Sequence, residues 1–189
     1  MTTPSTIDSP TLTTGTWTLD PSHSAVTFSI RHLGISKVRG RFDRFDATLE
    51  VGPNPSDIRV TATVDLSSVD TNHPDRDAHL RSTDFFDVET NPQMQFVSTS
   101  VTPFDDGYVM AGDLTLNGIT RPLELPVEFH GVEEYMGNEL HAGFSGQGEL
   151  RRSEFGIDFG LLPLGGDRLA LADVVKIELD VQFVAPAAE

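Results

Sequence analysis

Apolar and polar residues alternate with a period of two along much of this chain. Val26, Phe28 and Ile30 alternate with threonine, serine and arginine, and residues 58–66 and 175–183 alternate without interruption. A period of two gives a strand one apolar and one polar face. These segments are therefore expected to form half-buried β-strands.

Other segments have the same character and are separated by glycine, proline, asparagine or aspartate. They cover residues 15–19, 37–51, 94–101, 107–116, 123–132 and 140–152. With the first three segments they make about eight or nine strands, which are antiparallel if the turns are hairpins. The pattern predicts an all-β fold, and by itself it fits a sandwich as well as a closed barrel.

Residues 72–82 depart from this period and are expected to form a short helix. Thr71 or Asn72 can cap its first turn, and Pro74 suits that turn because its nitrogen has no hydrogen to donate. Asp75 and Asp77 lie where the helix dipole is positive.

The chain of 189 residues fits one domain. Residues 1–14 are rich in threonine, serine and proline and are expected to be a flexible tail before a single barrel domain at 15–186. The start has neither a basic stretch nor an apolar stretch of the export type, so a cytoplasmic location is expected. No apolar run approaches the roughly 18 residues that span a bilayer, so stable membrane insertion is not expected.

Charge narrows the range of partners. Thirteen basic and 29 acidic residues give a net charge of −16, which disfavours nucleic acid as a partner. Five basic residues nevertheless fall within fourteen positions, and only Asp43 opposes them there. They form either an anion site or ordinary surface ion pairs. These residues are Arg31, Lys37, Arg39, Arg41 and Arg44.

Few residues suggest catalysis or metal binding. The chain has no cysteine, and its six histidines lack metal-ligand spacing. The run Gly143–Gly148 nearly spells a nucleophile elbow, but its second glycine comes one position late. We therefore expect no enzyme activity, no metal and no cofactor.

Phenylalanine dominates the aromatic residues, with twelve against one tryptophan and two tyrosines. A buried phenylalanine needs no hydrogen-bond partner, so the interior could be dry enough to enclose hydrocarbon. An ordinary packed core is the alternative.

Several motifs together resemble the YceI-like family. The runs lie in the family's order at residues 17–34, 40–42, 77–87, 112–123 and 152–157. The resemblance implies an extended, antiparallel, eight-stranded lipocalin-like barrel with a short helix. It also implies a long apolar tunnel that binds polyisoprenoids such as prenyl pyrophosphates, quinone-like lipids or fatty amides. Many members carry an export signal, and none is expected from the first residues of this sequence.

The resemblance and the strand pattern together suggest which residues contact a lipid. The polar head is expected near the basic run and the helix, at His32, Arg39, Arg41, His79 and Arg81. The apolar tail is expected against Phe28, Ile30, Phe42, Phe85, Phe96, Leu114, Phe129, Phe144 and Ile177.

The first hypothesis for function is a lipid carrier or reservoir, as a monomer or a homodimer. The alternatives are an enzyme that acts on a lipid head group and an interaction barrel without a ligand.

Overall fold

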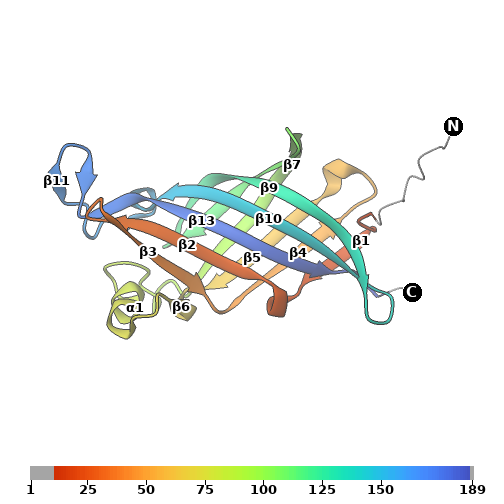
Figure 1. Cartoon of the computed structure of the whole chain (residues 1–189), viewed down its shortest axis with the longest axis horizontal. Coiled ribbons are helices and arrows are strands. Elements are labelled where there is room, and N and C mark those ends of the chain that lie inside the picture. Colours follow the sequence, from red (N-terminus) through yellow and green to blue (C-terminus); the bar gives the residue numbers. More distant parts are fainter. Residues whose placement is uncertain (1–10, 188–189) are drawn as a thin grey trace.

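Antiparallel strands and one short α-helix make up this protein, for which a computed structural model describes residues 11–187 (Figure 1). The helix is α1 (Pro74–Arg81). The main strands are β1 (Gly15–Leu19), β2 (Ala25–His32), β3 (Ser36–Phe42), β4 (Phe45–Val51), β5 (Arg59–Asp65), β6 (Val69–Asp70), β7 (Gln93–Phe104), β8 (Gly107–Leu116), β9 (Ile119–Tyr135), β10 (Glu139–Arg151) and β13 (Leu171–Val184). A small separate hairpin comprises β11 (Pro163–Gly165) and β12 (Arg168–Leu169). Short 3-10 helices are η1 (Pro21–His23), η2 (Pro55–Asp57), η3 (Leu66–Ser68) and η4 (Arg152–Phe155).

The first six strands act as three long, interrupted strands. β1 and β2 both run along β13, with Leu19 opposite Phe183 and Val26 opposite Leu179. In the same way, β4 pairs with β1 and β3 pairs with β2, so β3 and β4 form the next interrupted strand. The one after it consists of β5, which pairs with β4, and β6, which pairs with β3. Together with β7 to β10 and β13 they form a closed eight-stranded antiparallel barrel, which confirms the predicted fold.

The segment 37–51 was expected to be one strand, but it is broken at Asp43 and Arg44. Ser68 stabilises this break with two hydrogen bonds. Its hydroxyl accepts one from Arg44 N at 3.0 Å, and its carbonyl accepts one from Asp43 N. Phe42 and Phe45 both pack in the interior although they are three positions apart. That spacing does not fit a continuous strand, in which same-face residues are two apart.

A helix forms within the predicted range 72–82, but it begins later, at Pro74, and its cap differs from the prediction. His73, and not Thr71 or Asn72, caps α1, because its Nδ1 accepts from Arg76 N at 3.2 Å. Thr71 has another role, since its N–H and its hydroxyl both donate to the buried carboxylate of Asp77. This contact ties α1 to the end of β6.

The two ends of the barrel differ. We call one the lid end, because the β2–β3 turn, α1 and the β11–β12 hairpin lie there; the described chain termini lie at the other, terminal end (Figure 1). A two-residue Asn117–Gly118 turn links β8 to β9, and both residues have a positive φ, as such turns require. Of the predicted tail, Leu12 packs against the barrel and Thr13 accepts a hydrogen bond from Trp17 Nε1, whereas residues 1–10 lie outside the described residues.

Buried apolar residues form two clusters. The lid-end cluster consists of Phe42, Val64, Leu66, Val69, Phe85, Phe96, Leu114, Leu116, Leu123, Leu125, Phe155 and Ile157. The terminal-end cluster consists of Trp17, Leu19, Leu49, Val132, Ala142 and Phe183. Burial of these side chains supplies the main favourable free energy of folding.

We expect Val181→Asp to lower the free energy of unfolding by about 3 kcal/mol or more, because it places an unpaired carboxylate against the terminal-end cluster. The neighbouring variant Glu178→Ala, on the exposed face of β13, should change it by less than about 0.5 kcal/mol. Urea unfolding measures both, and equal losses would contradict the assigned strand faces.

Candidate functional site

Part of the inner surface of the barrel is apolar but not packed. Ile30 lies directly opposite Val38 on one side and Val175 on the other, and Ile177 lies opposite Phe28. The four residues Ile30, Val38, Val175 and Ile177, which we call the inner-face patch, share the face by which Phe28 packs inward. Each is only half-buried, and within residues 11–187 none packs against either cluster. Apolar surface that water can reach therefore faces the interior.

The nine residues predicted to contact a lipid tail all lie in or against the interior, but in different surroundings. Phe42, Phe85, Phe96 and Leu114 are buried in the lid-end cluster, and Phe28 packs against it. Phe129 and Phe144 stack at 5.0 Å between ring centroids and pack against the terminal-end cluster. Ile30 and Ile177 belong to the inner-face patch. These last two thus have more surface left for a ligand than the four buried residues.

The edge of β3 is open beside this patch. β6 pairs only with Arg41 and Phe42, so in the described chain residues 36–40 of β3 have β2 as their one partner. Gly40 lies under the ring of Phe28, and a Cβ there would come within 2.4 Å of that ring. The unpaired stretch therefore forms a rim between the inner face and the outer face of the barrel.

A hollow of about 420 Å³ lies on the outer face at this rim. Lys37, Arg39 and Arg41 line it, together with Asp70 and Glu178. Arg41 donates to Asp43 and to Asp70 at 2.7 Å each, and the Asp43 carboxylate raises the pKa of Arg41 above its usual value. Lys37 and Arg39 form no ion pair with any residue of 11–187. Their charges are therefore available to an anion.

The other three predicted head-group residues are not part of this hollow. Arg81 donates to the carbonyls of Ser67 and Val69 and so fastens α1 to the barrel. His79 Nε2 is 2.7 Å from Asp84, and His32 is exposed at the end of β2. The structure thus brings Arg39 and Arg41 together, and it places them on the opposite face of β3 from the inner-face patch.

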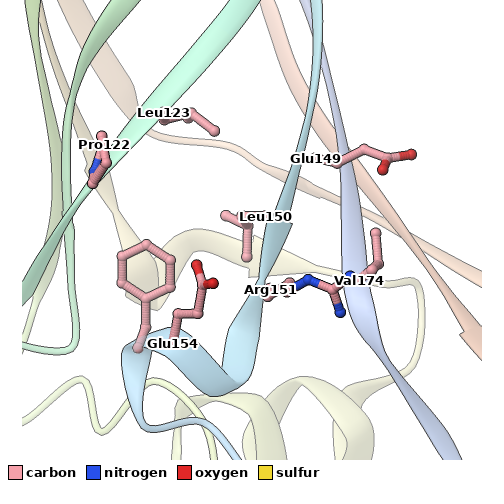
Figure 2. A pocket seen from close by; sticks show the side chains of 8 residues that line it. Pro122, Leu123, Glu149, Leu150, Arg151, Glu154 and Val174 are labelled. Carbon is pink, nitrogen blue, oxygen red and sulfur yellow. The ribbon is translucent and has the colours of Figure 1, made fainter.

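A second hollow, of about 290 Å³, lies where β9 and β10 separate. The ladder between β9 and β10 ends at Val127 and Gly146. Before Val127, β9 pairs with β8 but not with β10, and Pro122 and Pro126 in this part have no N–H to donate. Figure 2 shows Leu123 on β9 and Leu150 on β10 at this hollow, with η4 beside them. Side-chain contacts, and not backbone hydrogen bonds, thus join β9 and β10 at this point of the barrel wall.

Arg152 is a key residue to which sequence reasoning gave no role. It is 3 % exposed, and its guanidinium donates at 2.7–3.0 Å to four carbonyls, of Ile157, Phe159, Leu171 and Ala172. Burial lowers the pKa of Arg152 from its usual value, although an arginine stays protonated in proteins. Arg152 therefore holds together the two ends of the segment that carries the β11–β12 hairpin.

The carboxylate of Asp173 anchors η4 next to Arg152. Burial opposes its charged form, but hydrogen bonds from the N–H and hydroxyl of Ser153, both 2.9 Å, lower the pKa of Asp173 below its usual value. The sequence signal for Arg152 and Ser153 is the run 152–157, which matches the YceI-like pattern but does not reveal what each residue contacts; Asp173 lies outside that run.

Residues 11–187 contain no group of three histidine, aspartate or glutamate side chains placed to hold a metal ion. In that same part of the chain no helix is long and apolar enough to cross a membrane.

The architecture defines a class of protein, the closed eight-stranded antiparallel barrel with a lipocalin-like plan. Within it, this chain belongs to the YceI-like domain family, whose pattern matches residues 17–183.

Individual relatives agree with this assignment. A UPF0312 protein of Pectobacterium atrosepticum is 40% identical over 146 residues, which cover 77% of this chain and 76% of that protein. The crystal structure of Burkholderia cenocepacia BcnA is similar, with a TM-score of 0.72, 25% identity and coverage of 87% of this chain and 98% of BcnA. A polyisoprenoid-binding domain of Saccharophagus degradans has the same fold, with a TM-score of 0.66, 14% identity and coverage of 90% and 98%.

We expect Arg152→Ala to lower the free energy of unfolding by about 3 kcal/mol or more, because it leaves four carbonyls without their charged donor. The adjacent variant Arg151→Ala is the control: its ion pair to Asp173 is 3.6 Å long and the side chain is 61% exposed. That loss should be below about 1 kcal/mol. Chemical unfolding measures the free energy of unfolding of both variants. Similar losses of stability would contradict the structural role assigned to Arg152.

Proposed function

We propose that this protein binds an elongated apolar lipid of the polyisoprenoid class inside its barrel and acts as a carrier or reservoir. The observation that carries the proposal is the inner-face patch, an apolar, half-buried surface that packs against neither cluster. Each methylene of a ligand buried there contributes roughly 0.8 kcal/mol, so a long prenyl chain gains much from this surface. One protein of this fold is described as polyisoprenoid-binding, and the same ligand class is proposed here.

The head group of the lipid would lie at the rim of β3. A chain that rests on the inner-face patch can pass the unpaired edge at residues 36–40 and place its head in the basic hollow outside. Arg39 offers a planar fork of donors suited to phosphate oxygens, and Lys37 adds a second charge. The unpaired N–H groups of the β3 edge can supply further donors. A prenyl pyrophosphate is therefore the ligand that best fits both the inner-face patch and the basic hollow.

Binding, and not catalysis, is the activity that these contacts favour. Three charged side chains at the barrel serve the fold, because Arg81 and Arg152 donate to backbone carbonyls and Asp77 accepts from Thr71. A cytoplasmic location stays a prediction from the sequence, and so does a homodimer.

The tail site can be tested with Ile177→Gln. The side chain of Ile177 is outside both clusters, so we expect the variant to fold normally but to bind a prenyl alcohol about ten-fold more weakly, since it loses one large apolar contact. Organic extraction of the purified protein followed by mass spectrometry measures its bound lipid, and a fluorescent prenyl probe measures affinity. Lys176→Gln, one position away on the exposed face and outside the basic hollow, is the control. Equal lipid in both variants, or no lipid and no probe binding in the wild type, would refute the proposal.

The head-group site predicts a difference between two neighbouring arginines. Arg39→Ala should weaken binding of a prenyl pyrophosphate by about ten-fold, because one charge-assisted contact contributes roughly 1.5 to 3 kcal/mol. Arg41→Ala should have a smaller effect, because Arg41 already pairs with Asp43 and Asp70. Neither variant should change the affinity for the uncharged alcohol.

Titration calorimetry with both ligands distinguishes these outcomes, and Arg59→Ala is the matched control, because Arg59 is exposed on the outer face of β5 and does not line the hollow. If Arg39→Ala loses no more affinity than Arg59→Ala, the head group lies elsewhere.

A further inference from the structure

Five large apolar side chains are exposed together at the lid end. Ile35 is 76% exposed and Leu162 is 66% exposed, whereas the apolar side chains of the core are at most 9% exposed. The full set comprises Leu33, Ile35, Phe159, Leu162 and Leu164, and we call it the lid-end tip. An exposed apolar surface of this kind marks an interaction site.

Backbone contacts hold the two parts of the lid-end tip against each other. Leu33 N donates to the carbonyl of Ala170, and Ala170 N donates to the carbonyl of Leu162, both at 2.9 Å. In addition, the side chain of Arg168 lies against Gly34. The β2–β3 turn and the β11–β12 hairpin therefore form one surface, and Figure 1 shows both projecting from the same end of the barrel.

Charge distinguishes the lid-end tip from the apolar side chains exposed on two other hairpins. Phe104, Tyr108, Tyr135 and Met136 are also exposed, on the β7–β8 and β9–β10 hairpins. Residues 101–109 and 132–140 around them contain five acidic and no basic residues. Residues 31–37 and 158–169 around the lid-end tip contain three basic residues, Arg31, Lys37 and Arg168, and only two acidic ones. The tip is thus the apolar surface that an anionic partner can approach.

We propose that the lid-end tip docks this protein on lipid bilayers that contain anionic lipids. Apolar side chains on two projecting turns can enter the boundary between head groups and acyl chains, while Arg31, Lys37 and Arg168 meet the lipid phosphates. The tip is continuous with the inner-face patch, because Ile30 and Val38 directly precede and follow Arg31 and Lys37. Docking by this end would bring the interior of the barrel to the bilayer surface.

The net charge of −16 does not prevent this contact. Charges beyond about 8 Å are largely screened at physiological salt. The 13 residues of β10 span roughly 43 Å at about 3.3 Å per residue, so the acidic β9–β10 hairpin is several screening lengths away from the lid end. The acidic hairpins at the far end therefore contribute little to the field at the tip.

Vesicle flotation tests the docking with the full chain. Wild type should float with vesicles of phosphatidylcholine and phosphatidylglycerol, and less with phosphatidylcholine alone. The double variant Ile35→Ser/Leu162→Ser should reduce the vesicle partition coefficient by about ten-fold or more, because it removes two apolar side chains. The matched control, Phe104→Ser/Met136→Ser, removes two equally exposed apolar side chains from the acidic hairpins and should leave partitioning unchanged.

The charge contribution has its own pair of variants. Arg31→Glu should abolish the preference for phosphatidylglycerol, whereas Arg59→Glu, on the outer face of β5, should retain it. Absence of flotation by wild type, or equal losses in the two double variants, would overturn the proposal. A third outcome would also overturn it. If sedimentation shows that wild type self-associates, and Ile35→Ser/Leu162→Ser abolishes this self-association without changing flotation, the tip binds a second copy of this chain and not a bilayer.

Docking does not depend on the lipid cargo, so the two proposals can fail separately. Ile177→Gln, which is expected to bind lipid more weakly, should still float like wild type. A wild type that floats but yields no lipid on extraction would refute the carrier function and retain the docking surface. A protein that holds lipid but does not float would refute the docking alone.

Discussion

Closure of the sheet along β13 is the interaction on which the rest of the structure depends. β13 pairs with β10 on one side and with both β1 and β2 on the other, so the first and last described strands complete the barrel. This seam gives the interior its walls, because it places Phe28 and Ile30 of β2 opposite Ile177 and Val175 of β13. It also joins residues some 150 positions apart, such as Thr27 and the carbonyl of Glu178. Without it, the inner-face patch would not exist.

The places where the barrel departs from complete pairing are those that suggest function. β3 has an unpaired edge at residues 36–40, and β9 separates from β10 beyond Val127 and Gly146. Local structure replaces the missing ladders: Thr71 and Asp77 hold α1 near the first opening, and η4 lies beside the second. An apolar interior with such openings suits a ligand that must enter and leave, whereas a fully laddered wall would enclose it.

Buried and half-buried polar side chains stabilise the lid end. Arg152 donates hydrogen bonds to four backbone carbonyls, and Arg81 donates to two. Asn117 donates to the carbonyl of Phe155 and accepts from Asn91. Several of these residues lie in the runs that match the family, so part of the family pattern records how the lid is held and not what the barrel binds. A buried carbonyl without a donor is costly, which explains why such contacts use fixed residue types.

The amino-acid sequence by itself determined the faces of the strands, the all-β fold and the family, because a period of two and short local motifs need no knowledge of distant residues. It also indicated that Phe28, Ile30 and Ile177 face inward. Only the tertiary structure decided that Arg39 and Arg41 lie on the outer face at an open edge and that Arg81 and Arg152 are bound to carbonyls. Those roles depend on partners distant in the chain, for instance Arg81 with Ser67 and Arg152 with Ala172, 14 and 20 positions away. Alternation along a strand tells which way a side chain points, but the position of neighbouring strands determines what it meets.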